Sequence, residues 1–107
     1  MITEKRLEEA LKYLAESDNE HAKLSAGVEY IKDLAKHYKG KYIMNSEEKS
    51  VALKEQSYYA SDEYKKHIDD KKDLINDLTL LENKRSKESL VIDVWRTLEA
   101  SRRKNNI

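Results

Sequence analysis

The chain has 107 residues, 39% of them charged, and its 21 Lys and Arg balance its 21 Asp and Glu. This balance removes any argument from net charge to a nucleic acid or an anionic membrane as partner. The absence of Cys excludes disulfides, thiolate catalysis and Cys-ligated zinc. With two Gly and no Pro, few turns are expected, so the composition is typical of long exposed helices in a single domain, residues 1–107.

The first predicted helix begins after Thr3, a plausible N-cap, and runs from Glu4 to Lys39 or a little beyond. Acidic residues recur throughout its first turns, so we expect neither a signal peptide nor a membrane span, and a cytoplasmic protein. Its buried stripe advances by threes and fours, which is a helical period. The stripe consists of Leu7, Leu11, Leu14, Ser17, His21, Leu24, Val28, Ile31, Ala35, Tyr38 and Tyr42.

Three features of this segment bear on whether the helix is continuous, how closely it packs and where it ends. The run Ser17-Asp18-Asn19-Glu20 fits a capping box, so a kink near Ser17 is the alternative to one continuous helix. Gly27 in mid-helix predicts a close approach of a neighbouring helix. Gly40 predicts a left-handed cap that ends the helix, although the apolar residues after it invite another turn.

Two further helix starts follow in the sequence. Asn45-Ser46-Glu47-Glu48 predicts a short helix from Glu47 to about Tyr59, because a capping side chain precedes two acids. Ser61-Asp62-Glu63 repeats this signal and predicts a long helix from Asp62 to about Arg103. The segment Glu82–Ser89 carries no apolar residue and is expected to form two solvated helical turns rather than a loop. The apolar set of the long helix is Tyr64, Ile68, Leu74, Ile75, Leu78, Leu81, Val91, Ile92, Trp95 and Leu98.

These elements predict an all-α fold: an elongated antiparallel helical hairpin, or a three-helix coiled-coil-like bundle. The first and third helices should be antiparallel, because the segment between them is too short to return the chain for parallel packing. A long, thin apolar stripe is not covered on both flanks by one other helix. We therefore expect a homodimer of coiled-coil type.

The histidines suggest no metal site. His21 and His37 lack partners at the spacing that a ligand set requires, although His21 in the stripe suits a polar residue that sets the helix register. Glu63, His67 and Asp70 share one helix face, which permits a cation site or acid–base chemistry but is more often a surface charge cluster. No phosphate loop or catalytic arrangement is found, so neither a cofactor nor enzymatic activity is expected.

The C-terminal end is the candidate contact surface. Trp95 is expected to anchor the helix pair beside Leu7 and Leu11. The helix dipole favours the cations around it, and these cations also suit a protein partner or nucleic-acid phosphates. These candidate contact residues are Arg96, Arg102, Arg103, Lys104 and Arg85.

The ending VIDVWRTLEASRRKNNI and the opening SDEYKKHIDDKK of the long helix resemble a family of small helical proteins of tailed bacteriophages and prophages. That family carries a V-W-R-T/S signature near its C-terminus, matched by Val94-Trp95-Arg96-Thr97, and is often encoded near early or recombination genes. The resemblance spans nearly the whole chain. It implies a phage accessory protein acting in the host cytoplasm, and it implies no mechanism.

The sequence thus predicts a protein that acts by protein–protein interaction, as a modulator of recombination or of a host nuclease or defence complex. Its partner would be a host or phage protein, and no membrane is involved. The alternative is a nucleic-acid-binding accessory protein that uses the basic C-terminal helix end. Phosphate binding weakens steeply as salt rises, which distinguishes the two.

Overall fold

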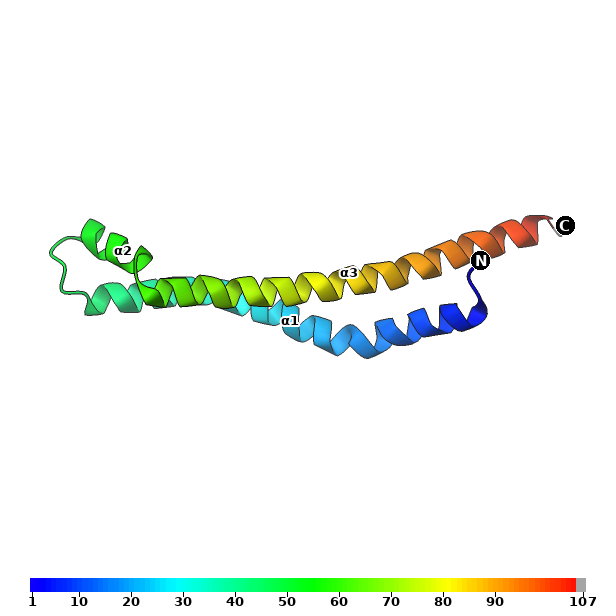
Figure 1. The fold of residues 1–107 in the computed structure, drawn as a ribbon, viewed down its shortest axis with the longest axis horizontal. Helices are drawn as coiled ribbons and strands as arrows, with labels where there is room; N and C mark the ends of the chain where they lie inside the picture. Colours follow the sequence, from blue (N-terminus) through cyan, green and yellow to red (C-terminus); the bar gives the residue numbers. More distant parts are fainter. Residues whose placement is uncertain (106–107) are drawn as a thin grey trace. The chain divides into compact units, whose positions relative to one another are not determined.

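The computed structural model describes residues 1–105, so the last two residues of the predicted domain lie outside the described part. The described residues form three helices and no strand: α1 (Glu4–Asn45), α2 (Val51–Tyr59) and α3 (Asp62–Asn105) (Figure 1). The prediction of an all-α fold is confirmed.

Two local hydrogen bonds show where α1 begins and that it continues through Ser17. Thr3 Oγ1 accepts a hydrogen bond from the backbone N–H of Arg6 at 3.1 Å, which confirms the predicted cap. The helix is continuous through Ser17, whose hydroxyl donates to the carbonyl of Tyr13 at 2.7 Å. Gly40 does not end it, because no described residue has the positive φ that a left-handed cap requires. α1 therefore extends to Asn45.

The start of α2 differs from the prediction. Asn45 still belongs to α1, so it is not available as a cap for the next helix. Ser46 accepts from the N–H of Glu48 at 3.3 Å within the connection. The true N-cap is Ser50, whose side chain accepts from the N–H of Leu53 at 3.1 Å. The helix begins at Val51 rather than Glu47, and it ends at Tyr59 as predicted.

α3 begins and continues as predicted. Ser61 Oγ accepts from the N–H of Tyr64 at 3.2 Å, and Asp62 and Glu63 occupy the first turn, where the helix dipole favours acids. The helix is unbroken through residues 82–89, so that segment is not a loop.

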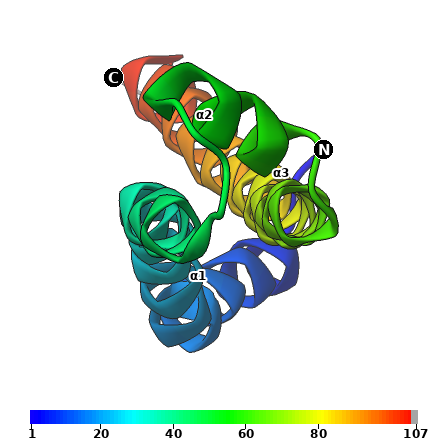
Figure 2. The ribbon, with the colours of Figure 1, turned by 90° about the vertical axis from the view of Figure 1, so that its left-hand side faces the viewer.

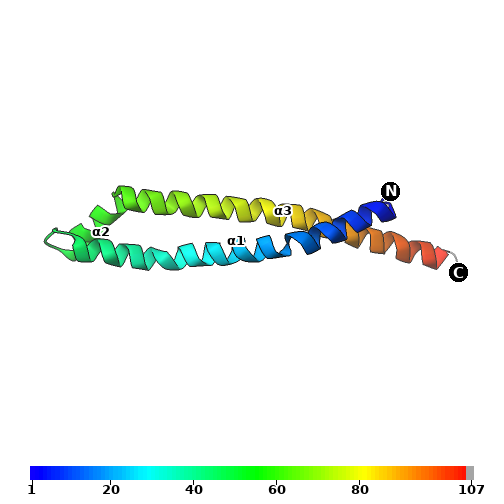
Figure 3. The same ribbon diagram turned by 90° about the horizontal axis from the view of Figure 1, so that it is seen from below.

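The chain divides into two compact units. Unit 1 comprises Met1–Ala22 with the described part of α3 from Thr79 onward, and unit 2 comprises Lys23–Leu78. In unit 1 the helices are antiparallel, since Arg6 contacts Glu88 while the later residue Ser17 contacts the earlier residue Arg85. In unit 2, α1 and α3 run side by side in opposite directions (Figure 3).

In unit 1, the positions that face the other helix form what we call the seam. On α3 they follow one another by threes and fours, the spacing that keeps one helix face toward a partner. Charged and hydroxyl side chains occupy several of them, including positions that the sequence predicted to be solvated. The seam comprises Leu7, Ala10, Leu14, Ser17 and His21 from α1, and Leu81, Arg85, Glu88, Ile92 and Trp95 from α3.

Several residues of the predicted stripes lie outside the contact. Ala10 is fully buried whereas its neighbour Leu11 is 50% exposed, so Leu11 was wrongly placed in the contact. On α3 of unit 2, His67 is buried against Tyr38 of α1 and Lys71 is half-buried, whereas the predicted Ile68 and Ile75 are 41% and 37% exposed. The predicted stripes consist mainly of apolar residues. A lysine can nevertheless pack its aliphatic stem against a neighbouring helix.

The core of unit 2 contains Val28, which is 4% exposed, and a cluster of aromatic rings. Tyr58 of α2 is only 2% exposed, and its ring centroid lies 5.4 Å from that of Tyr42 on α1 and 5.3 Å from that of Tyr64 on α3. These separations are those of favourable tilted ring pairs. The Tyr42 hydroxyl is 2.8 Å from Ser57 Oγ, which adds a second tie between α1 and α2. α2 thus joins the end of α1 to the start of α3 (Figure 2).

The glycines of α1 have no packing role. A Cβ built on Gly27 or on Gly40 would have no neighbouring atom within 4 Å. The close helix approach predicted at Gly27 is therefore absent.

Candidate functional site

The cations predicted at the C-terminal end lie on the last turns of α3. Arg96, Arg103 and Lys104 are exposed, and none has an ion-pair partner among the described residues. Arg102 donates from Nη2 to Glu99 Oε2 at 2.8 Å. Three of the predicted contact residues therefore present unpaired charge to solvent.

Arg85 has a different position from the one expected of a partner contact. Its Nη1 donates to the carbonyl of Leu14 at 2.9 Å and to Ser17 Oγ at 2.6 Å, and its Nη2 lies 3.5 Å from Asp18 Oδ1. Only 20% of its side chain is exposed. The guanidinium fork satisfies several acceptors of α1 at once, so Arg85 joins the two helices of unit 1.

A second polar tie lies one turn further along α3. Arg6 Nη2 donates to Glu88 Oε1 at 3.0 Å and lies 2.7 Å from Oε2 of the same carboxylate. Arg85 and Glu88 both belong to the segment 82–89, which was predicted to be solvated. Their contacts with α1 make this segment part of the seam. The sequence contains a signal for this contact, because four positions are spaced by threes and fours: Leu81, Arg85, Glu88 and Ile92. The predicted stripe does not include Arg85 and Glu88 because it was built from apolar residues.

Trp95, the predicted anchor, is half-buried on the same face of α3. Of its predicted neighbours, Leu7 is half-buried and Leu11 is exposed on another face of α1. A position in the seam favours the anchoring role, and the contribution of Trp95 to stability stays a prediction.

An exposed apolar face remains on this part of α3. Leu90, Val94 and Leu98 follow one another by four residues and are 61%, 39% and 47% exposed. Leu90 and Val94 lie two residues on either side of Ile92, which places them about 200° around the helix from that seam residue. We call these three residues the outer face of α3.

A groove of about 380 Å³ borders this outer face. Leu90 contributes to both, so the groove and the outer face are continuous. Leu14 and His21 form its wall on α1, and His21 is half-buried there. Its lining from α3 includes Ser86, Ser89 and Asp93.

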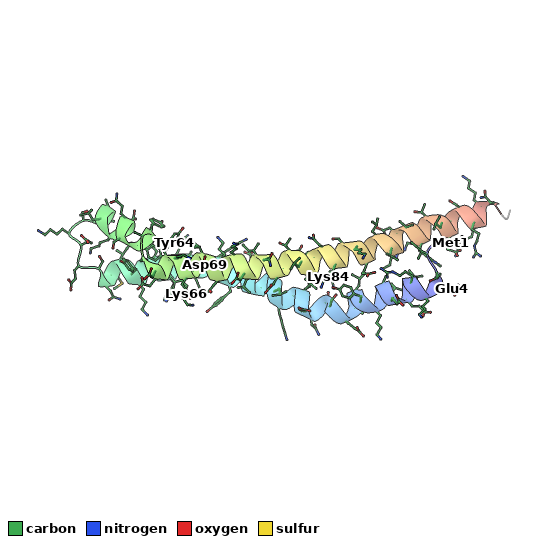
Figure 4. The ribbon with its side chains drawn as sticks, viewed as in Figure 1. Met1, Glu4, Tyr64, Lys66, Asp69 and Lys84 are labelled. Carbon is green, nitrogen blue, oxygen red and sulfur yellow. The ribbon has the colours of Figure 1, made fainter. Side chains whose placement is uncertain are left out.

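Charges of both signs lie on this part of α3. The bases Lys84 (Figure 4), Lys87 and Lys104 are exposed, and so are the acids Glu82 and Asp93, which line the groove. None of the three lysines forms an ion pair with a described residue. A lysine beside an apolar strip, such as Lys87 beside Leu90, is complementary to an acid beside the apolar strip of a partner.

The group Glu63, His67 and Asp70 lies in unit 2, where all three residues line one cavity. Lys66 donates to Asp70 Oδ2 at 3.0 Å, so one carboxylate already has a cationic partner. Among the described residues, no group of three potential ligands is arranged to hold a metal ion. His37 is exposed, with its ring 5.9 Å from that of Tyr38.

Comparison with models of protein families, with curated proteins and with solved structures finds no match for this chain. The resemblance to helical phage proteins therefore stays a prediction. None of the described helices has a stretch long and apolar enough to cross a membrane.

Proposed function

We propose that this chain is a non-catalytic accessory protein that binds a helical segment of a partner protein on the outer face of α3. The observation that carries the proposal is the exposure of Leu90, Val94 and Leu98, which form one strip along α3 that begins on the side opposite the seam. Three apolar side chains at successive helical turns suit an amphipathic helix laid alongside them. The groove beside Leu90 is a place for one anchoring side chain of that helix.

The charges specify the partner further. Lys87 lies one helical turn from Leu90, so the docking helix should carry Asp or Glu opposite it, beside its own apolar residues. Arg96 and Arg103 add positive charge at the same end. Such charges favour fast association and select against basic helices.

The phage resemblance supplies the biological context of the proposal. In that context the partner is a host or phage protein in the host cytoplasm, and binding modulates recombination or a host nuclease or defence complex. Direct binding of nucleic acid by the basic end is the alternative. It is less favoured because Arg85 is held in the seam and Arg102 is paired with Glu99, which leaves fewer free cations for phosphates.

The test begins with capture of partners from the host by the tagged protein, with and without nuclease treatment. A captured protein is then purified, and its affinity is measured for the parent and for the double variant Leu90→Asp with Leu98→Asp. We expect affinity to fall by about a hundredfold, because two buried apolar contacts are replaced by charges next to an acidic helix. Leu53→Asp is the matched control, since Leu53 of α2 is also 47% exposed.

Equal affinity of the parent and the double variant would overturn the proposal. Capture that disappears with nuclease, together with affinity that falls steeply with salt, would establish the nucleic-acid alternative. The predicted homodimer is tested separately, by light scattering of the parent at micromolar concentration. A dimer that the double variant dissociates would show that a second copy occupies the outer face, which would also overturn the foreign-helix proposal.

A further inference from the structure

Unit 2 contains a cavity that the proposed interaction surface of unit 1 does not use. Its volume is about 800 Å³, within the range of small-molecule sites in proteins. The last turns of α1, the connection after it, α2 and the first turns of α3 all contribute to its lining. Tyr64, Lys66 and Asp69 locate these first turns of α3 in Figure 4. Four segments of the chain therefore converge on one cavity.

Aromatic rings form part of the lining. Tyr38 meets His67 edge to face, with ring centroids 5.1 Å apart, and both residues line the cavity. Tyr42 lines it as well, and its hydroxyl is held by Ser57. The faces of such rings attract cations through their quadrupole.

The charge of the lining is negative. Glu47, Glu48, Glu63 and Asp70 contribute four carboxylates, against the two ammonium groups of Lys41 and Lys66. Lys66 is bound to Asp70, and the three glutamates have no ion-pair partner among the described residues. A cleft lined mainly by one sign of charge raises the local concentration of ions of the opposite sign.

His67 supplies the second, independent observation. Its side chain lies in the lining, the residue is only 6% exposed, and Nδ1 is buried without a hydrogen-bond partner among the described residues. Buried polar atoms of folded proteins nearly always have a partner. A neutral imidazole nitrogen that carries no proton accepts hydrogen bonds, so an N–H donor in the cavity would supply what is missing.

Unit 2 already holds one ammonium group in this manner. Lys39 Nζ lies 5.2 Å from the centroid of the Tyr59 ring and 3.4 Å from Glu55 Oε1. The hydrogen bond to Tyr59 and the nearby Glu55 carboxylate raise the pKa of Lys39. Tyrosine rings combined with glutamates are thus a cation-binding arrangement in this unit.

We propose that the cavity binds an aliphatic di- or polyamine, or the alkylammonium group of a lysine side chain. The cationic nitrogens lie among the unpaired glutamates and over Tyr38 and Tyr42, and the carbon chain covers the apolar part of the lining. The cavity is much larger than one ammonium group, which favours a linear amine with two charged ends. Glu47 with Glu48 lies on the connection and Glu63 lies on α3, so the two ends have separate acidic partners.

The experiment is calorimetric titration of the full chain with spermidine, with the amide of N-acetyl-lysine, and with 1,6-hexanediol as an uncharged chain. We expect saturable binding of at least one of the two amines and none of the diol. Glu47→Gln with Glu63→Gln should weaken amine binding by about tenfold at low salt, because two charge contacts are lost. Both residues are exposed, so this variant should fold as the parent does.

Asp73→Asn is the matched control. Asp73 is an exposed carboxylate on α3 of the same unit that does not line the cavity, and its removal should leave the affinity unchanged. Binding of spermidine identifies a free polyamine as ligand, and binding of the lysine amide alone identifies a protein side chain. The proposal is overturned if neither amine binds, if the diol binds equally well, or if the double glutamine variant binds as tightly as the parent. Equal weakening by Asp73→Asn would show only diffuse attraction to acidic helices and would also overturn it.

Discussion

The same two helices are joined by different chemistry in the two units. In unit 1 the seam contains a guanidinium, a carboxylate and a hydroxyl, with Arg85 bound to Ser17 and Arg6 bound to Glu88. In unit 2 the core contains buried Val28 and a cluster of tyrosines around Tyr58. Polar ties demand a particular geometry because each donor needs its acceptor, whereas buried rings contribute mainly through the area they remove from water. The stability of unit 1 therefore depends more on correct helix register, and the stability of unit 2 depends more on apolar burial.

The largest effect on stability is expected from a substitution in the tyrosine cluster of unit 2. Tyr58→Ala should lower the free energy of unfolding by about 3–5 kcal/mol, because it leaves a cavity where a nearly fully buried ring met Tyr42 and Tyr64. Urea denaturation followed by circular dichroism measures the loss. Tyr30→Ala is the control, since Tyr30 is 66% exposed and should change stability little. A loss similar to that of the control would mean that the tyrosine cluster does not hold unit 2 together.

The polar side is tested by Arg85→Ala. We expect a loss of about 2 kcal/mol, since charge-assisted hydrogen bonds to Leu14 and Ser17 disappear. Lys84→Ala, at the exposed neighbouring position, should leave stability nearly unchanged. The same denaturation measurement applies to both variants. If Arg85→Ala is as neutral as Lys84→Ala, the contacts of Arg85 contribute nothing to the joining of the helices.

A smaller effect of opposite sign is expected in unit 2, where α1 carries both glycines of the chain. Gly27→Ala and Gly40→Ala should each raise the free energy of unfolding by about 0.5–1 kcal/mol, because alanine is the better helix former and an added Cβ meets no atom. Thermal melting measures the gain. A fall in melting temperature at Gly27 would indicate that another chain packs closely on that face, which would favour the predicted homodimer.

The smallest effect is a pH dependence. Burial raises the pKa of Tyr58 above its ordinary value. The neutral phenol is favoured in the folded protein, so this contribution to stability is complete below the unfolded pKa of about 10 and is lost as pH rises through the higher folded value. Tyr58→Phe should therefore reduce the fall in melting temperature at alkaline pH, whereas Tyr30→Phe should not. Identical alkaline profiles for the two variants would show that Tyr58 does not ionise with unfolding.

Local signals in the sequence predicted the helices well. The caps at Thr3 and Ser61 bond as expected, and the charged segment 82–89 is helical because its residues are good helix formers. The start of α2 was wrong because two serines competed as caps, and the choice depended on where α1 ended. The candidate contact surface was only partly predictable. Exposed Arg96 and Lys104 follow from a polar helix end, but the position of Arg85 depends on acceptors 68 and 71 residues away in the chain.

The sequence by itself thus determined the helical class and the approximate extent of the three helices, because caps, periodicity and the scarcity of Gly and Pro act over a few residues. Only the tertiary structure decided which face of each helix is buried. Ala10 is buried instead of Leu11, and His67 instead of Ile68, although hydrophobicity alone favours the other choice in each pair. The free energy of a helix contact depends on shape and on hydrogen-bond partners supplied by the other helix. The pattern of one helix does not contain that information.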